Sequence, residues 1–276
     1  MPNIVINGVR TYYEKKGKGP PIVLIHGLGS SHLEWEQVRS YLVSKYTVYT
    51  YDVRGHGQSE KTKGPFTMEL FAADAKAFIE KMGLKKVTIG GCSMGGMIAF
   101  QFAVDYPQLL ENLIIVNSVP EVKLKTLREK AILYTRLLLL NTLGLHNMAR
   151  VLVYKVFPRP DQAEIRRREL ERFLLNDEET YRACIKAIVG WGVKERLKEI
   201  KVPVLVVSAE NDYLPLSYKK EYVKQIPNAQ LVVIKKSRHV TPIDQPEQLA
   251  KAILKFLDTL NKEQKNPEAS FKDASR

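Results

Sequence analysis

A serine enclosed by glycines is the first group in this sequence that could do chemistry. Residues 90–96 read GGCSMGG, so Ser93 has a glycine two positions before it, Gly91, and another two positions after it, Gly95. An apolar strand pattern precedes this segment and a helical pattern follows it. In a tight strand-to-helix turn, side chains at the two flanking positions would collide, and glycine relieves the collision while leaving the central hydroxyl exposed. The pattern Gly-x-Ser-x-Gly therefore predicts a serine nucleophile.

A serine hydroxyl is a weak nucleophile until a base takes its proton, and a histidine oriented by a carboxylate is the expected base. His239 follows the last predicted strand, and the acid should follow the strand before it. There Asp212 is the first choice and Glu210 the alternative. Loops at the carboxyl ends of strands are where open α/β sheets build their sites. The order Ser93, Asp212, His239 places the acid between the other two, as in one class of hydrolase.

Short apolar runs alternate with helical patterns along the chain. Because these runs are continuous and β-branched, they indicate strands buried on both faces, and their alternation with helices predicts a mostly parallel sheet covered on both sides. An antiparallel hairpin is expected at one edge, where Asn7 and Gly8 supply a turn. The predicted strands are residues 21–25, 47–51, 87–89, 113–116, 204–207 and 231–234, and predicted helices include residues 70–81, 97–103 and 249–260.

The alternation stops between about residues 120 and 198, where only helical patterns occur. We interpret this stretch as a helical insertion. Its leucine run, residues 137–140, either forms the core of the insertion or lines an apolar channel. The predicted organisation is a hydrolase core in two parts (1–119 and 199–261), a helical cap (120–198) and a polar C-terminal tail (262–276) expected to fray.

Taken together, these features resemble the α/β-hydrolase superfamily, in its esterase/lipase-like branch with a helical cap. Four stretches carry the resemblance: residues 26–31 (HGLGSS), residues 52–59 (DVRGHGQS), the serine segment, and Asp212 with His239. The resemblance covers nearly all of the chain outside the cap and the tail. It implies an α/β-hydrolase fold, with a mostly parallel central sheet, helices on both faces and an inserted helical cap.

The resemblance assigns His26, Gly27, Leu28 and Gly29 to an oxyanion loop. Acyl transfer builds negative charge on the former carbonyl oxygen, and losing one fixed N–H donor there costs about 3 kcal/mol. The expected donors are the backbone N–H groups of Leu28 and Met94. Gly27 and Gly29 let the backbone approach closely, and His26 is expected to hold the loop by a hydrogen bond.

A few other residues could matter for the site. Trp35 and Trp191 are candidates for lining the substrate pocket, with core packing as the alternative interpretation. By the resemblance, Arg54 and His56 belong to a turn scaffold beside the site. Cys92 is expected to point into the sheet as a small core residue.

Composition narrows the class of protein. The chain of 276 residues suits one large domain or a core with an inserted subdomain, and 45% hydrophobic residues allow a sizeable core. We find no apolar run of the roughly 20 residues that a membrane helix needs, and no secretory signal. Two cysteines give neither a disulfide framework nor zinc-ligand spacing. We expect a cytoplasmic, soluble protein without metal or cofactor, either a monomer or a homodimer.

The formal charge of +13 is spread along the chain, and no nucleic-acid-binding motif accompanies it. We therefore interpret it as a lysine-rich surface, with an anionic substrate or lipid surface as the alternative. The densest basic cluster, residues 166–168 with Arg172, alternates with glutamates and predicts a solvated helix face with local ion pairs.

The predicted function is hydrolysis of small-molecule carboxylic esters of small to medium acyl chain by a serine–histidine–aspartate mechanism. Lactone hydrolysis and perhydrolysis use the same machinery and stay open. A carbon–carbon bond hydrolase is less favoured, because such relatives often carry Trp after the histidine and this chain has Val240. A ligand receptor of the same fold would keep the same residues, and slow turnover with tight binding would distinguish it.

Overall fold

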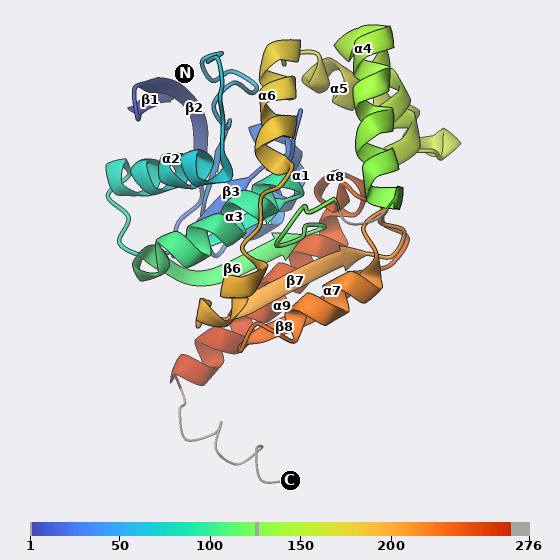
Figure 1. The fold of residues 1–276 in the computed structure, drawn as a ribbon. Coiled ribbons are helices and arrows are strands. Elements are labelled where there is room, and N and C mark those ends of the chain that lie inside the picture. Colours follow the sequence, from blue (N-terminus) through green and yellow to red (C-terminus); the bar gives the residue numbers. More distant parts are fainter. Residues whose placement is uncertain (1, 125–126, 266–276) are drawn as a thin grey trace.

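The computed structural model describes residues 2–124 and 127–265. Within them the apolar runs form one eight-stranded sheet in the order β1-β2-β4-β3-β5-β6-β7-β8 (Figure 1). Strands β3 to β8 are parallel, and β2 runs antiparallel to both β1 and β4. The strands are β1 (Asn3–Ile6), β2 (Val9–Lys16), β3 (Pro21–Ile25), β4 (Thr47–Tyr51), β5 (Val87–Cys92), β6 (Leu110–Val116), β7 (Val204–Ala209) and β8 (Ala229–Ile234).

The predicted edge hairpin is confirmed. β1 and β2 pair antiparallel through a two-residue connection, with φ of 45° at Asn7 and 78° at Gly8. Two successive positive φ values match the strand twist of a tight hairpin, and asparagine and glycine tolerate them best.

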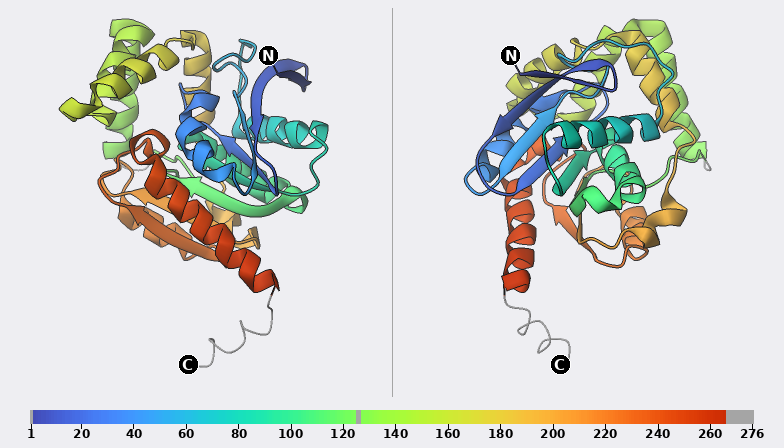
Figure 2. Two further views of the ribbon diagram at one scale, coloured as in Figure 1. Left: turned by 180° about the vertical axis from the view of Figure 1, so that it is seen from behind. Right: turned by 90° about the vertical axis from the view of Figure 1, so that its left-hand side faces the viewer.

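Helices cover both faces of the sheet, as the continuous apolar strands predicted (Figure 2). Along β3, Val23 and Ile25 pack into one core cluster, while Ile22 and Leu24 pack into the other. This alternation follows from the two-residue repeat of a strand. One cluster contains residues of α2 (Met68–Lys81), α3 (Met94–Asp105) and α7 (Leu216–Val223); the other contains residues of α1 (Glu36–Leu42) and α9 (Pro246–Lys265).

The segment between β6 and β7 forms the cap, and its described residues contain no named strand. The cap helices gather at one end of the molecule (Figures 1 and 2). A small apolar core joins them, in which Leu140 and Tyr181 are buried, whereas Leu138 is 60% exposed. Leu137, Leu139 and Leu140 of the leucine run therefore pack within the cap, whereas Leu138 does not. The helices are α4 (Leu127–Val156), η3 (Pro160–Gln162), α5 (Ala163–Phe173) and α6 (Glu178–Ile188), with η4 (Lys194–Glu199) leading back to the sheet.

One sequence expectation needs correction. Within the described residues, the 24-residue segment Leu133–Val156 of α4 is long and apolar enough to cross a membrane by length and composition alone. The sequence reading missed it because charged residues interrupt the apolar run. In the structure Gly144 breaks the helix with φ of 70°, and one side of α4 packs on the other cap helices. Such a segment is equally typical of a helix in a folded cap.

The predicted C-terminal tail, residues 262–276, lies only partly within the described residues. Residues 262–265 continue helix α9, and residues 266–276 of the tail lie outside the described residues.

Candidate active site

Ser93 lies in the turn between β5 and α3, where its backbone adopts φ of 53° and ψ of −116°. The flanking glycines are required by close packing. A Cβ on Gly91 would lie 2.1 Å from the carbonyl oxygen of Gly95, and a Cβ on Gly95 would lie 2.2 Å from that of Ile25. The strained turn predicted from Gly-x-Ser-x-Gly is thus present, and it lifts the serine side chain out of the sheet.

Two hydrogen bonds connect the three side chains chosen from the sequence. His239 Nε2 lies 2.9 Å from Ser93 Oγ, and His239 Nδ1 lies 2.7 Å from Asp212 Oδ1. A carboxylate accepts from Nδ1–H, which leaves Nε2 as an acceptor for the serine hydroxyl. The alternative acid, Glu210, accepts instead from the backbone N–H of Lys236. The structure therefore places Asp212 behind the histidine.

Asp212 has a second partner that sequence reasoning did not find. The Nζ atom of Lys219 lies 2.5 Å from Asp212 Oδ2 and donates to Ser208 Oγ at 3.0 Å. Burial opposes ionisation of Asp212, but His239 and Lys219 outweigh it and lower the pKa of the carboxyl. This keeps Asp212 ionised, as a partner for an imidazolium must be.

Asn117 fixes the loop that carries His239. At the end of β6 its backbone φ is 46°, and its Nδ2 donates to the carbonyl oxygen of His239 and to Thr241 Oγ1, both at 2.7 Å. Its Oδ1 accepts from the N–H of Ala209 at 2.7 Å. One side chain thus ties the ends of β6 and β7 to the histidine loop. Sequence reasoning gave it no role.

Tyr213 covers the other side of His239. Its hydroxyl lies 2.8 Å from His239 Nε2, and the two ring centroids are 4.0 Å apart. The hydroxyls of Tyr213 and Ser93 therefore share the same nitrogen. The sequence signal for Tyr213 is only its position next to Asp212.

The loop after β3, predicted to be an oxyanion loop, lies close to Ser93. A Cβ on Gly27 would lie 3.4 Å from Ser93 Cβ, and Gly27 itself donates its N–H to Glu34 Oε2 at 3.0 Å. Among the described residues, no acceptor is found for the N–H groups of Leu28 and Met94. These are the two amides predicted as donors to an oxyanion.

His26 has a structural position. Its Nε2 accepts from the N–H of Val53 at 3.0 Å, and its Nδ1 lies 2.8 Å from the carbonyl oxygen of Gly27. Burial lowers the pKa of His26 to about 4, so the ring is neutral and uses both nitrogens to hold the loop.

The neighbouring scaffold residues are also placed in packing roles. Arg54 donates to the carboxylate of Asp74 at 2.5 and 2.7 Å. His56 is buried, and burial lowers its pKa to about 3. Cys92 is buried in a core cluster, as expected from its direction into the sheet.

Both tryptophans are buried in core clusters. Trp35 is completely buried in the core against α9, and Trp191 donates its Nε1–H to Gln101 Oε1 at 2.7 Å in the opposite cluster. Core packing, the alternative interpretation, describes both. Both indole rings pack against residues of the hydrolase core.

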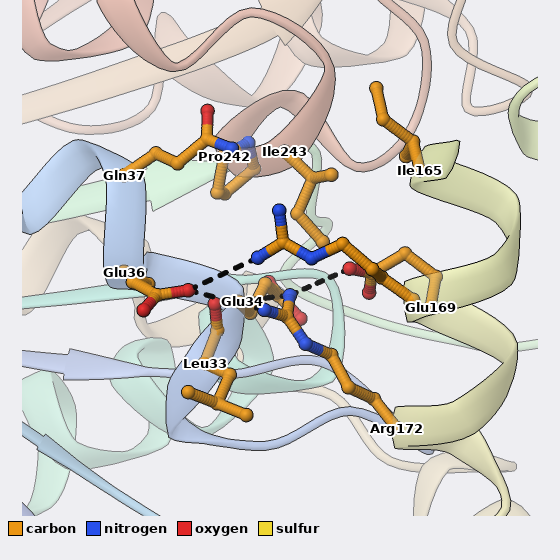
Figure 3. A pocket seen from close by; sticks show the side chains of 10 residues that line it. Leu33, Glu34, Glu36, Gln37, Ile165, Glu169, Arg172, Pro242 and Ile243 are labelled. Carbon is orange, nitrogen blue, oxygen red and sulfur yellow. Dashed lines mark hydrogen bonds and ion pairs between the residues drawn. The ribbon is translucent and has the colours of Figure 1, made fainter. Parts of the chain in front are cut away.

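The basic cluster of α5 is only partly the solvated face that its sequence predicted. Arg167 pairs locally with Glu164 and Glu171, but Arg172 reaches Glu36 at 3.2 Å and lies only 11% exposed. Figure 3 shows Glu36 of the core facing Arg172 of the cap across a small hollow. The hollow measures about 10 Å³, room for about one water molecule, so it is a seam between cap and core. The glutamate pattern within α5 gave no sign of this partner.

The described residues contain no group of three or more His, Cys, Asp or Glu side chains that could hold a metal ion. The site consists of a serine hydroxyl, an imidazole and a carboxylate joined by hydrogen bonds. A family model described as alpha/beta hydrolase fold matches residues 20–246. The chain belongs to the α/β-hydrolase family. It is a hydrolase with a central, mostly parallel sheet.

Known relatives of this α/β hydrolase differ in their reactions. The chain is 25% identical to 3-oxoadipate enol-lactonase 2 of Acinetobacter baylyi, over 88% of its own length and 90% of that protein. It is 25% identical to a thermophilic esterase of Thermogutta terrifontis, solved with malate bound, with a TM-score of 0.83 over 94% and 99% of the two chains. An uncharacterized protein of Mycobacterium tuberculosis is 36% identical over 113 residues, but the match spans only 41% of this chain and 33% of that protein.

Proposed function

We propose that this α/β hydrolase cleaves small-molecule carboxylic esters through an acyl-enzyme on Ser93. The observation that carries the proposal is the continuous chain of hydrogen bonds from Asp212 through His239 to Ser93 Oγ. The two free cysteines, Cys92 and Cys184, are buried, which supports a proposed cytoplasmic location.

In the first half-reaction, Ser93 Oγ attacks the ester carbonyl carbon while His239 Nε2 takes its proton. The carbonyl oxygen becomes an oxyanion, which the N–H groups of Leu28 and Met94 stabilise. Asp212, kept ionised by Lys219, stabilises the imidazolium. The carbon–oxygen bond to the alcohol then breaks, and the alcohol leaves with the proton from Nε2.

In the second half-reaction, water attacks the acyl-enzyme and gives its proton to His239 Nε2. The bond between the acyl carbon and Ser93 Oγ breaks, and the serine recovers the proton. The products are the carboxylic acid and the free enzyme. No metal or organic cofactor takes part in the proposed steps.

Lactone hydrolysis is the second candidate, because a lactone is an internal ester and the same groups would open it. The similarity to an enol-lactonase along 88% of this chain favours it. We do not propose perhydrolysis, carbon–carbon bond hydrolysis or a receptor role.

The test is hydrolysis of p-nitrophenyl esters from acetate to dodecanoate, with δ-valerolactone followed by acid release. Wild type, Ser93→Ala and the exposed-serine control Ser40→Ala are compared. We expect turnover of at least about 1 per second for wild type and the control. We expect Ser93→Ala to lower turnover by at least about 1,000-fold. Equal rates in wild type and Ser93→Ala would reject the proposal, whereas a lactone rate far above every ester rate would assign the second candidate.

A further inference from the structure

Arg136 of α4 is a positive charge that the acyl-transfer machinery does not use. Its Nε donates to the hydroxyl of Tyr181 at 2.6 Å, its Nη2 donates to the same oxygen, and its Cζ lies 5.2 Å from the centroid of the Tyr181 ring. Tyr181 is completely buried in the cap core. The guanidinium is thereby held in one position against the cap core.

Arg136 also has no carboxylate partner among the described residues, unlike other poorly exposed arginines of this chain. Arg39 pairs with Glu14, and Arg54 pairs with Asp74. A guanidinium stays charged at all relevant pH values, and removing it from water without an anion is costly. Only Tyr181 accepts from Arg136, and no acceptor is found in the described part of the chain for its Nη1. The N–H donors of Arg136 Nη1 are thus available to a ligand.

Two sets of interactions connect Arg136 with the candidate active site. The Tyr181 ring lies 5.4 Å from that of Phe173, and Phe173 covers Gly29 of the oxyanion loop, where a glycine Cβ would meet it at 2.5 Å. On the other side, partial burial raises the pKa of Tyr213, which is still 38% exposed, and the charge of Arg136 acts to lower that pKa. The hydroxyl of Tyr213 is the one that contacts His239 Nε2. Arg136 is therefore bonded to the cap core through Tyr181, and its charge acts on the tyrosine that contacts His239.

We propose that Arg136 binds a carboxylate on the acyl part of the substrate, so that the natural substrates are anionic esters or lactones derived from dicarboxylic acids. This inference rests on the proposed function and names its substrate class. The planar guanidinium fork matches a carboxylate, and charge-assisted hydrogen bonds in a partly desolvated site are strong enough to decide between substrates. A purely structural role toward Tyr181 would require only a neutral donor, so it does not explain the charge.

The experiment compares mono-p-nitrophenyl glutarate with p-nitrophenyl pentanoate, which has the same chain length without the carboxylate. The quantity measured is the ratio of the two kcat/KM values. We expect wild type to prefer the anionic ester, and the ratio to fall about 30-fold in Arg136→Gln. Arg136→Lys should give an intermediate ratio, because it keeps the charge and loses the fork. The control is Arg150→Gln, an exposed arginine on the same helix, which should keep the wild-type ratio.

A binding measurement separates this inference from the proposed function. By calorimetry, glutarate should bind to wild type and to Ser93→Ala more tightly than pentanoate does, and Arg136→Gln should remove that difference. If Ser93-dependent ester hydrolysis is present but the ratio is the same in wild type and Arg136→Gln, the carboxylate site is rejected and the proposed function stands. If no ester is hydrolysed yet glutarate binding depends on Arg136, the proposed function falls and the anion site stands.

Discussion

At the scale of single residues, His239 Nε2 faces two hydroxyls but has one lone pair to offer. With Nδ1–H donated to Asp212, Ser93 Oγ at 2.9 Å and Tyr213 at 2.8 Å compete for that nitrogen. Tyr213→Phe removes one competitor and keeps the ring on the imidazole. We expect kcat/KM to rise about threefold, the worth of part of one hydrogen bond. Steady-state kinetics on p-nitrophenyl butyrate measures this, and a tenfold fall would show instead that the phenol assists the reaction.

Lys219 helps to keep the carboxylate of Asp212 ionised. Both side chains are almost fully buried, and the ion pair between them is 2.5 Å long. Lys219→Met should lower kcat/KM by about tenfold and the free energy of unfolding by about 3 kcal/mol, because Asp212 loses a buried partner. The exposed neighbour provides the control, since Lys220→Met should change neither quantity. Kinetics together with urea unfolding test this, and a Lys219→Met protein indistinguishable from the control would contradict it.

At the scale of elements, the cap is bonded to the loop after β3. Asn176, just after α5, donates its Nδ2–H to the carbonyl oxygen of Gly29 at 2.9 Å, and this bond is buried. Asn176→Ala leaves that oxygen unpaired, which should cost about 1–2 kcal/mol of unfolding free energy. It should also lower kcat/KM by about tenfold, because the amide of Leu28 is no longer fixed. Asn147→Ala, an exposed cap asparagine, serves as the control, and equal kcat/KM in both variants would refute this role of the cap.

A comparison of predicted and observed strands shows which elements a sequence pattern can identify. Continuous β-branched runs predicted β3, β4 and β7 closely, because burial on both faces demands such residues. The same kind of run located β8, although β8 is an edge strand with Val233 39% exposed. β5 and β6 extend further than predicted, to Cys92 and back to Leu110, since glycines and polar residues in them hide the strand pattern. The glycine-rich turn and the positions of Asp212 and His239 could be predicted because local geometry and strand order fix them.

The remaining site residues depend on contacts between distant parts of the chain. The sequence predicted that Arg172 is part of a solvated face, but in the fold Arg172 pairs with Glu36, which is distant in the sequence. Lys219, Asn117 and Arg136 act through partners that no local spacing reveals. Lysine and arginine are usually exposed, so a sequence alone assigns them to the surface.

At the scale of the whole molecule, two buried neutral histidines make stability depend on pH. The pKa of His26 is lowered by burial from 6.5 to about 4, and that of His56 to about 3. Below about pH 6.5 these histidines bind protons in the unfolded chain but not in the folded protein. The free energy of unfolding therefore falls as the pH falls. We expect a loss of about 2 kcal/mol for each histidine between pH 7.5 and pH 5.

Urea unfolding across this pH range measures the loss. His56→Gln should remove roughly half of the histidine contribution. His146→Gln, at an exposed cap position, should keep the wild-type slope. Identical slopes in wild type and His56→Gln would contradict the assignment.

The central claim is that Ser93 is the nucleophile, activated by His239. The most direct measurement is mass spectrometry of the protein after reaction with a fluorophosphonate, which traps an activated serine irreversibly. The account predicts one adduct, on the peptide containing Ser93, absent in Ser93→Ala and strongly slowed in His239→Ala. An adduct on another residue, or no adduct in the folded wild-type protein, would contradict it.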